Sequence, residues 1–202
     1  MRFLIRLANR TKVAPAETKR LSKLAYETVK NYGADIGNLR VSSSAVEFDL
    51  LIDSADKLQT AVKALETKIG SLLTLRKLDV KPLEIGNDEA IRLGIELFNE
   101  ERYWESHEAL ESAWKNSTGD EKEVLQGLIL LAAALVHWQK NEEQVALSVM
   151  RRAREKLVAH RVEYFGIDIA DLTEKLDKML AANKPEFFRL ITGNNDLQTA
   201  KS

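Results

Sequence analysis

The periodicity of apolar residues changes near residue 84 of this 202-residue chain. Before that point, short stretches alternate with the period of two that is typical of half-buried strands. After it, apolar residues recur with the 3.6-residue period of amphipathic helices almost to the end of the chain. A stretch with proline and glycine at residues 81–88 marks the expected linker. The sequence therefore predicts an α+β chain with two domains and a polar tail, at residues 1–83, 88–192 and 193–202.

The first domain is expected to fold in the order strand, helix, strand, strand, helix, strand. Phe3, Ile5 and Leu7 alternate with more polar neighbours, and residues 45–53 alternate in the same way after a serine-rich turn. The order βαββαβ is that of a ferredoxin-like domain, an antiparallel sheet with two helices on one face. RNA-binding domains of this class need aromatic residues on the central strands to stack bases. We find none in that role, which argues against nucleic acid as a partner.

The second domain is expected to be an all-helical bundle. Its loops are short, and short loops between successive helices favour antiparallel neighbours. Helices are predicted at residues 88–101, 103–114, 121–138, 145–157 and 171–182, with a last short one from Pro185 through Ile191.

Composition excludes several function classes. The net charge of -1 provides no general attraction for nucleic acid or an anionic membrane. The chain has no cysteine, which excludes disulfides, thiolate catalysis and cysteine-ligated metal sites and suits a reducing cytoplasm. Its longest apolar run, residues 127–136, is far shorter than the roughly 20 residues that a membrane span needs. We expect a soluble cytoplasmic protein without a membrane partner.

Polar chemistry is concentrated in residues 103–114, which read YWESHEALESAW. At about 100° per residue, Glu105 and Ser112 should face away from the bundle and Glu108 should lie on the flank. The core-facing stripe should then contain Tyr103, Trp104, His107, Leu110, Glu111 and Trp114.

His107 and Glu111 are expected to be paired, because burying an imidazole or a carboxylate alone is costly. If the next helix packs antiparallel across a turn near residue 117, Gln126 comes beside His107. His137 should lie about 14 Å further along that helix and outside the site, and His160 is a more distant candidate. The predicted ligand-binding residues are Tyr103, His107, Glu111, Trp114 and Gln126.

Three interpretations of this cluster are open. It can be a polar network that fixes helix register, a site for a ligand or metal, or a catalytic site. As an enzyme, the chain would be a metal-assisted hydrolase with Glu108 or Glu111 as base and His107 as acid or metal ligand. A metal ion would be bound by His107 and Glu111. Zinc needs three or four ligands, which is more than these two residues supply. We therefore predict no cofactor and expect a non-enzymatic module, monomeric or homo-oligomeric, that binds a small molecule or a protein.

The stretch FNEERYWESHEALESAWK, followed by EKEVLQGLILLAAALVHWQKN, resembles the family named domain of unknown function 309. The resemblance covers about residues 88–160 and implies an all-helical bundle around the His-Glu motif, but no reaction. The chain departs from the family pattern only in turns, where the family tends to have glycines at Glu101 and around Lys140 to Gln144. The matching positions are Phe98, Asn99, Tyr103, Trp104, Glu105, His107, Glu108, Glu111, Trp114, Gln126, Gly127, Ala132 and Ala133.

Overall fold

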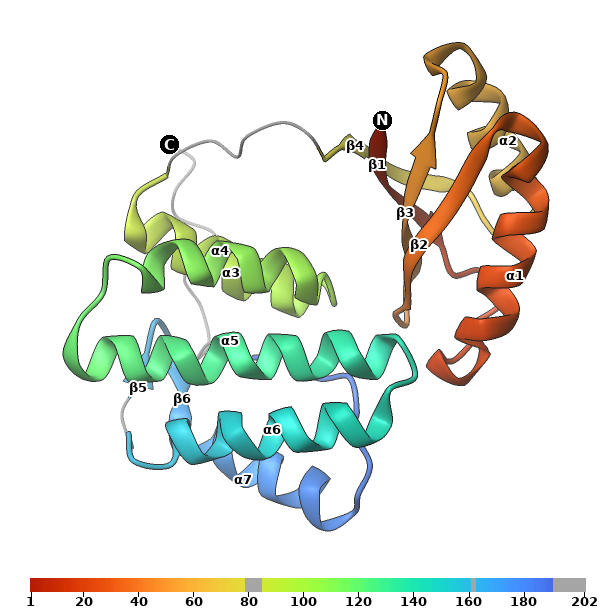
Figure 1. The fold of residues 1–202 in the computed structure, drawn as a ribbon. Helices are drawn as coiled ribbons and strands as arrows, with labels where there is room; N and C mark the ends of the chain where they lie inside the picture. The colour runs from red at the N-terminus through yellow and green to blue at the C-terminus, as the bar shows by residue number, and fades with distance from the viewer. Residues whose placement is uncertain (79–84, 161–162, 191–202) are drawn as a thin grey trace, which may run out of the picture. The chain divides into compact units, whose positions relative to one another are not determined.

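The computed structural model describes residues 1–78, 85–160 and 163–190 (Figure 1). By their contacts, the residues form two compact units, Met1–Glu84 with Val136–Glu142, and Ile85–Leu135 with Glu143–Ser202. An antiparallel sheet of four strands comes first, and a region of several helices follows. The mixed α+β class is thereby confirmed. The predicted boundary near residue 84 and the first half of the predicted linker lie outside the described residues.

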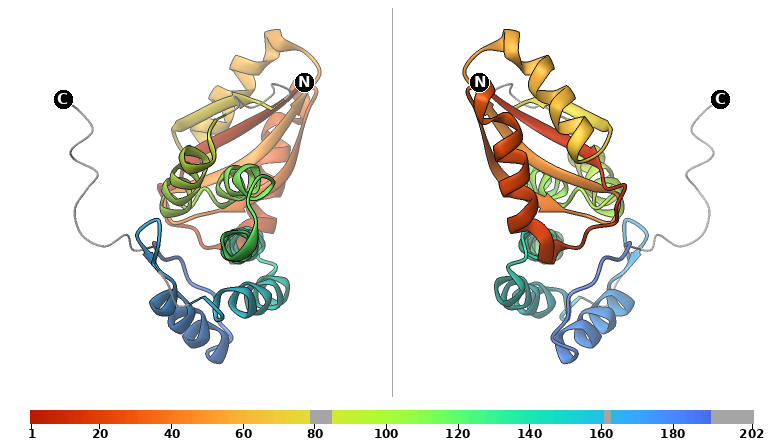
Figure 2. Two further views of the ribbon diagram at one scale, coloured as in Figure 1. Left: turned by 90° about the vertical axis from the view of Figure 1, so that its left-hand side faces the viewer. Right: turned by 90° about the vertical axis from the view of Figure 1, so that its right-hand side faces the viewer.

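The N-terminal sheet has the strand order β2-β3-β1-β4, and all three strand pairs are antiparallel. Two helices connect the strands and lie on the same side of the sheet (Figure 2). The elements are β1 (Arg2–Ala8), α1 (Thr18–Val29), β2 (Ala34–Val41), β3 (Ala45–Ile52), α2 (Leu58–Lys68) and β4 (Leu72–Lys77), with short 3-10 turns at Pro15–Glu17, Lys30–Tyr32 and Ala55–Lys57.

Alternation along the strands separates an apolar face of the sheet from a charged one. Ile5 and Phe48, which are opposite each other in the β1–β3 register, are buried in the core beneath α1 and α2. On the other face, the Arg40 guanidinium lies 2.7 Å from a carboxylate oxygen of Glu47, its cross-strand partner. Opposite charges in register stabilise a pair of strands. The period-two pattern of the sequence is thus realised on both faces.

The helical region contains five helices and a small hairpin among the described residues. The first four helices are joined by short turns, as the sequence predicts, and the small hairpin lies between the last two; α3 packs closely on α4 (Figure 1). The elements are α3 (Asn87–Asn99), α4 (Tyr103–Trp114), α5 (Gly119–Gln139), α6 (Glu143–Leu157), β5 (Glu163–Tyr164), β6 (Ile167–Asp168) and α7 (Ile169–Ala181).

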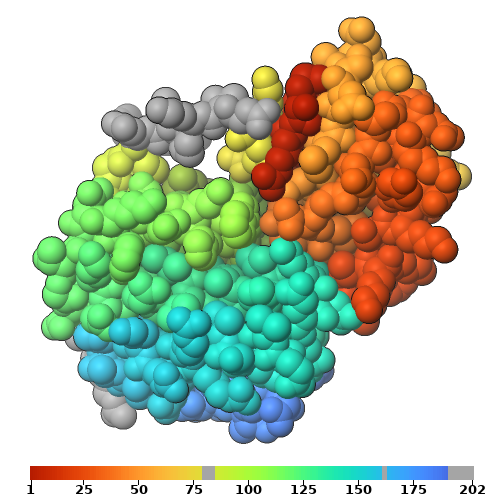
Figure 3. Space-filling model, viewed as in Figure 1, coloured from red at the N-terminus to blue at the C-terminus, as the bar shows by residue number. Residues whose placement is uncertain are grey.

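Two glycines allow the helices to approach closely. A Cβ atom on Gly94 of α3 would lie 2.6 Å from Cγ of Leu110 on α4. A Cβ atom on Gly127 of α5 would lie 2.6 Å from the side chain of Leu157 on α6. Since real Cβ contacts are longer than this, the leucine would have to move if alanine replaced the glycine at either crossing. Atoms of α5 and α6 are in close contact in the space-filling view (Figure 3).

Two features of the helical region differ from the prediction. Strands β5 and β6 are two residues long, too short to produce an alternating pattern in the sequence. The predicted last helix from Pro185 is wrong, because residues 184–190 form no helix. Phe187 and Phe188 pack instead against rings of α3 and α4. Ile191 and the predicted tail lie outside the described residues.

No helix in the described part of the chain has the length and apolarity needed to cross a membrane.

Candidate functional site

Helix α4 is held against α3 by a stripe of small and apolar side chains. Tyr103, Ser106, Leu110 and Ala113 are fully buried and recur at helical spacing. The Ser106 hydroxyl donates a hydrogen bond of 2.7 Å to the carbonyl oxygen of Gly94. This stripe is rotated by close to one residue, about 80°, from the predicted one centred on His107. The helix bounds were predicted correctly, but the buried face was not.

The rotation reverses two orientations that the sequence predicts. Glu105, predicted to face outward, is buried, with 7% of its surface exposed. It accepts two hydrogen bonds from the Arg102 guanidinium, at 2.8 and 3.0 Å. Trp104, predicted to face inward, is 41% exposed. Arg102 supplies the cation that allows Glu105 to be buried, and its i, i+3 spacing from Glu105 was the available signal.

His107 lies at the edge of this buried stripe and makes no hydrogen bond to Glu111 or Gln126. Its ring stacks on Trp104, with the centroids 5.7 Å apart and the planes 5° apart. The Nδ1 atom is buried and has no hydrogen-bond partner in the described part of the chain. Glu111 is 3.6 Å from the ammonium group of Lys115, and its side chain is 42% exposed. The predicted buried His107–Glu111 pair is therefore wrong.

Partial burial lowers the pKa of His107 below its ordinary value of 6.5, and the nearby Glu111 carboxylate opposes this shift. A histidine with a lowered pKa binds fewer protons in the folded than in the unfolded state, so folding stability rises with pH. We expect the contribution of His107 to be present above pH 6.5 and lost as the pH falls below it. Measured unfolding free energies between pH 5 and 7.5 should depend less on pH in His107→Gln than in the wild type.

NMR titration of the three histidines tests the same expectation directly. The resonance that disappears in His107→Gln identifies His107, so no further assignment is needed. It should titrate below pH 6.5. A midpoint at or above 6.5 would show that the ring is well solvated or paired, against the geometry described above.

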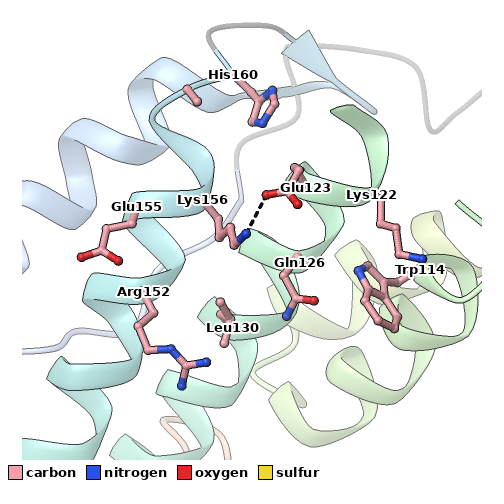
Figure 4. Close-up of a pocket in the computed structure, with 10 residues that line it drawn as sticks. Trp114, Lys122, Glu123, Gln126, Leu130, Arg152, Glu155, Lys156 and His160 are labelled. Carbon is pink, nitrogen blue, oxygen red and sulfur yellow. Dashed lines mark hydrogen bonds and ion pairs between the residues drawn. The ribbon is translucent and has the colours of Figure 1, made fainter. Parts of the chain in front are cut away.

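A pocket of about 640 Å³ lies where the end of α4 meets α5 and α6 (Figure 4). Helix α4 contributes one aromatic side chain, α5 and α6 contribute the charged and amide side chains, and two residues that follow α6 complete the lining. The lining residues are Trp114, Lys122, Glu123, Gln126, Leu130, Arg152, Glu155, Lys156, Ala159 and His160.

Cationic groups outnumber carboxylates in this pocket. Lys122, Arg152 and Lys156 face two glutamates, an excess of one positive charge without counting His160. Lys156 is 2.7 Å from Glu123, and this bond lowers the pKa of the Glu123 carboxyl. In the described part of the chain, no hydrogen bond or ion pair engages the Arg152 guanidinium, which points from α6 toward α5. The local charge thus favours an anion.

Aromatic and amide groups complete the lining. The Lys122 ammonium lies 4.4 Å from the centroid of the Trp114 ring, a cation–π contact across α4 and α5. Gln126 is one turn further along α5 than Lys122 and offers both a donor and an acceptor to the pocket. Trp114 and Gln126 are the two members of the predicted ligand cluster that the structure brings together, and the predicted distant candidate His160 joins them.

The remaining predicted residues lie elsewhere. Tyr103 belongs to the α3–α4 core, and its buried hydroxyl has no partner in the described residues. His107 and Glu111 lie on the surface of α4 outside the pocket lining, and Glu108 is exposed. His137 is outside the pocket, as predicted, and its Nδ1 atom is 2.5 Å from Glu142.

Three cations of the pocket were missed by the sequence reasoning. Arg152 and Lys156 lie in a charged stretch of α6, and Lys122 lies in the first turn of α5. Their role depends on the packing of α6 on α5, which Gly127 permits and which the helical period alone does not define. The spacing of Arg152 and Lys156 at i, i+4 on one face was a usable signal.

The metal hypothesis needs at least three converging ligands. Within residues 1–78, 85–160 and 163–190, no three His, Asp or Glu side chains are placed to hold a metal ion. His107 and Glu111 therefore have no third ligand among these residues.

Comparison with known proteins gives one family and one related structure. Residues 91–149 match the model of a family described as "Domain of unknown function (DUF309)". This confirms the resemblance, although the match is shorter than the predicted range and does not reach the N-terminal sheet. A solved structure of a conserved hypothetical protein from Thermus thermophilus is 33% identical over 45% of this chain and 94% of that chain, with a TM-score of 0.39. Curated proteins give no match.

Proposed function

Through residues 91–149 the chain belongs to the family of domains of unknown function described as DUF309, and we propose that this region is a non-enzymatic binding module for a small anionic ligand. The observation that carries the proposal is the pocket at Trp114 and Gln126. Two residues of the family-like motif line a pocket of about 640 Å³ in which cations are in excess. Pockets of roughly this size are typical of small-molecule sites.

The lining suits a ligand that combines an anionic group with a planar one. The Arg152 guanidinium can form paired hydrogen bonds with a phosphate or a carboxylate, and it is not engaged by another described residue. Lys156 adds a second cation on the same face of α6. Trp114 offers an aromatic surface, and the Gln126 amide can bond a heterocycle edge. A nucleotide or a comparable aromatic phosphate has both features.

His107 and Glu111 enter the proposal as a flank of this site. With Trp114 they follow the i, i+4, i+7 spacing along α4, so they share a face of the helix. A ligand larger than the pocket would extend over Glu111 toward the Trp104–His107 stack. The hydrolase alternative has no comparable support, because it requires converging ligands or bases at His107.

The finer architecture is also inferred here. We regard residues 1–83 as a ferredoxin-like domain, supported by the strand order β2-β3-β1-β4 with antiparallel neighbours and two helices on one face. We regard residues 88–192 as the bundle domain. A cytoplasmic location is supported by the absence of cysteine from the sequence.

Calorimetric titration with pyrophosphate and with ADP tests the binding proposal. Pyrophosphate probes the anion alone, and ADP adds a planar ring. We expect ADP to bind more tightly, and Arg152→Ala to weaken binding of both by about 10- to 100-fold, because a hydrogen bond to a charged group contributes about 1.5–3 kcal/mol. A higher salt concentration should also weaken the binding of both probes to the wild type, because salt screens the attraction between charges.

The neighbouring residue provides a matched control. Arg151 is exposed and does not line the pocket, so Arg151→Ala removes the same charge without removing a lining group. It should bind both probes like the wild type. Equal losses in Arg151→Ala and Arg152→Ala would show that only the general field of α6 attracts the anion. No heat of binding with either probe would refute the proposal.

A further inference from the structure

Residues 184–190 follow α7 as an irregular segment that contacts the end of α3 and the start of α4. The segment reads Lys-Pro-Glu-Phe-Phe-Arg-Leu. Its two aromatic rings and its final leucine reach residues at the junction of the two helices. None of the residues at this junction lines the pocket at Trp114 and Gln126.

Asn99 at the end of α3 binds the backbone of the segment. The Asn99 side-chain amide donates a hydrogen bond to the carbonyl oxygen of Leu190, at 3.2 Å. The N–H of Leu190 donates a second bond to the Asn99 side-chain oxygen, at 2.7 Å. The Asn99 side chain thus satisfies both backbone polar groups of Leu190, which belongs to no helix or strand. A pair of hydrogen bonds of this kind recognises the peptide backbone of a residue, whatever side chain that residue carries.

Aromatic rings provide the side-chain contacts. The Phe188 ring meets the Phe98 ring edge-on, with centroids 5.5 Å apart. The Phe187 ring lies nearly parallel to that of Tyr103, at 6.4 Å. Phe98 and Tyr103 also contact each other, at 4.8 Å, so both rings of the segment pack on one aromatic pair. The Leu190 side chain is buried as well.

Phe98, Asn99 and Tyr103 are all part of the motif that resembles the family, and none of them lines the pocket. They define what we name the Asn99 site. We propose that the Asn99 site is a peptide-binding site for short segments of the pattern Phe-Phe-x-Leu, and that residues 185–190 of this chain occupy it in cis. We call the Asn99 side chain, with its two hydrogen bonds to the backbone of one residue, the clamp. The clamp supplies affinity through the main chain of the peptide, and the aromatic pair supplies selectivity through its two rings.

Controlled cleavage of the full chain tests whether the site accepts a peptide in trans. A protease recognition sequence inserted after Asn183, in the turn that follows α7, leaves the folded chain intact until it is cut. The probe is a fluorescent peptide with the sequence of residues 184–190. We expect it to bind the uncut chain at least about tenfold more weakly than the cut chain, because a tethered segment competes at an effective concentration on the order of millimolar.

Backbone methylation tests the clamp itself. A peptide with an N-methyl group on Leu190 cannot donate to Asn99 and should bind the cut chain about five- to tenfold more weakly, the equivalent of one net hydrogen bond. The matched control is a peptide methylated at Glu186, whose N–H is engaged by no other described residue. It should bind like the unmodified peptide.

Two results with the cut chain would contradict the proposed peptide site. A cut chain that stays folded but does not bind the unmodified peptide would overturn the proposal. Equal effects of the two methyl groups would also overturn it, since the clamp would then play no part. Phe187→Ala in the uncut chain provides a variant that leaves the clamp in place. It should increase binding of the wild-type peptide by weakening the segment that competes, and an unchanged affinity would count against occupation in cis.

Discussion

Replacing Gly70 with alanine is expected to lower the free energy of unfolding of the N-terminal unit by about 3 kcal/mol, near the upper end of overpacking effects. Gly70 lies between α2 and β4, where a Cβ atom would be 2.0 Å from the carbonyl oxygen of Ala8. That oxygen belongs to backbone at the end of β1, and it cannot rotate away as a side chain can. The Ala8 N–H also donates a 2.8 Å hydrogen bond to Ser71, which fixes the two segments together.

Denaturant unfolding followed by circular dichroism measures the loss, and hydrogen exchange of the Ala8 amide localises it. Gly37→Ala is the matched control in the same sheet, because a Cβ atom there would meet only side-chain atoms at 3.8 and 3.9 Å. It should change stability by no more than about 0.5 kcal/mol. A Gly70→Ala protein with unchanged exchange at Ala8 would mean that the α2–β4 turn adjusts without strain.

Leu110→Ala is expected to destabilise the helical region by about 2–5 kcal/mol, because the side chain is completely buried between α3 and α4. The same leucine determines the effect of a change at Gly94. A Cβ atom on Gly94 would lie 2.6 and 2.7 Å from the Leu110 side chain, so Gly94→Ala alone should cost about 1–3 kcal/mol. In the Leu110→Ala background the collision is removed. There Gly94→Ala should stabilise by up to about 1 kcal/mol, the helix preference of alanine over glycine.

A double-mutant cycle of thermal and urea unfolding measures this reversal of sign. Leu93→Ala on α3 serves as the control, because Leu93 is an exposed leucine on the same helix. Its expected cost is below about 1 kcal/mol. If Gly94→Ala destabilised both backgrounds equally, the close approach of α3 and α4 at Leu110 would not be the reason for the glycine.

The sequence predicted the elements of this chain better than their faces. Helix α4 begins and ends at Tyr103 and Trp114, as the periodicity indicates, yet Ser106 and Ala113 are buried while Trp104 is exposed. Predicting the face from bulk and hydrophobicity failed because α3 approaches closely at Gly94, where small residues pack best. The burial of Glu105 followed from a cation one residue before the helix, which a helical wheel does not include.

The candidate site was predictable only in the parts that belong to one helix hairpin. Trp114 and Gln126 could be associated because a short turn joins their helices. Arg152 and Lys156 lie on α6, and their position beside Gln126 depends on where α5 and α6 cross. Gly127 leaves room for Leu157 at this crossing, a tertiary relation without a periodic signature. The pairing of His107 with Glu111 failed for the same reason as the face of α4.

The bond between Asn99 and Leu190 joins residues 91 positions apart in the chain. During synthesis, α3 and α4 would therefore leave the ribosome long before the segment that covers Phe98 and Tyr103. Until then, the aromatic pair at the Asn99 site has to remain exposed or be covered temporarily by other apolar groups. Contacts of such sequence separation slow folding, since the loop they close must be ordered first. We therefore expect residues 184–190, which lie beyond the stretch matched by the family, to dock late in the formation of the helical region.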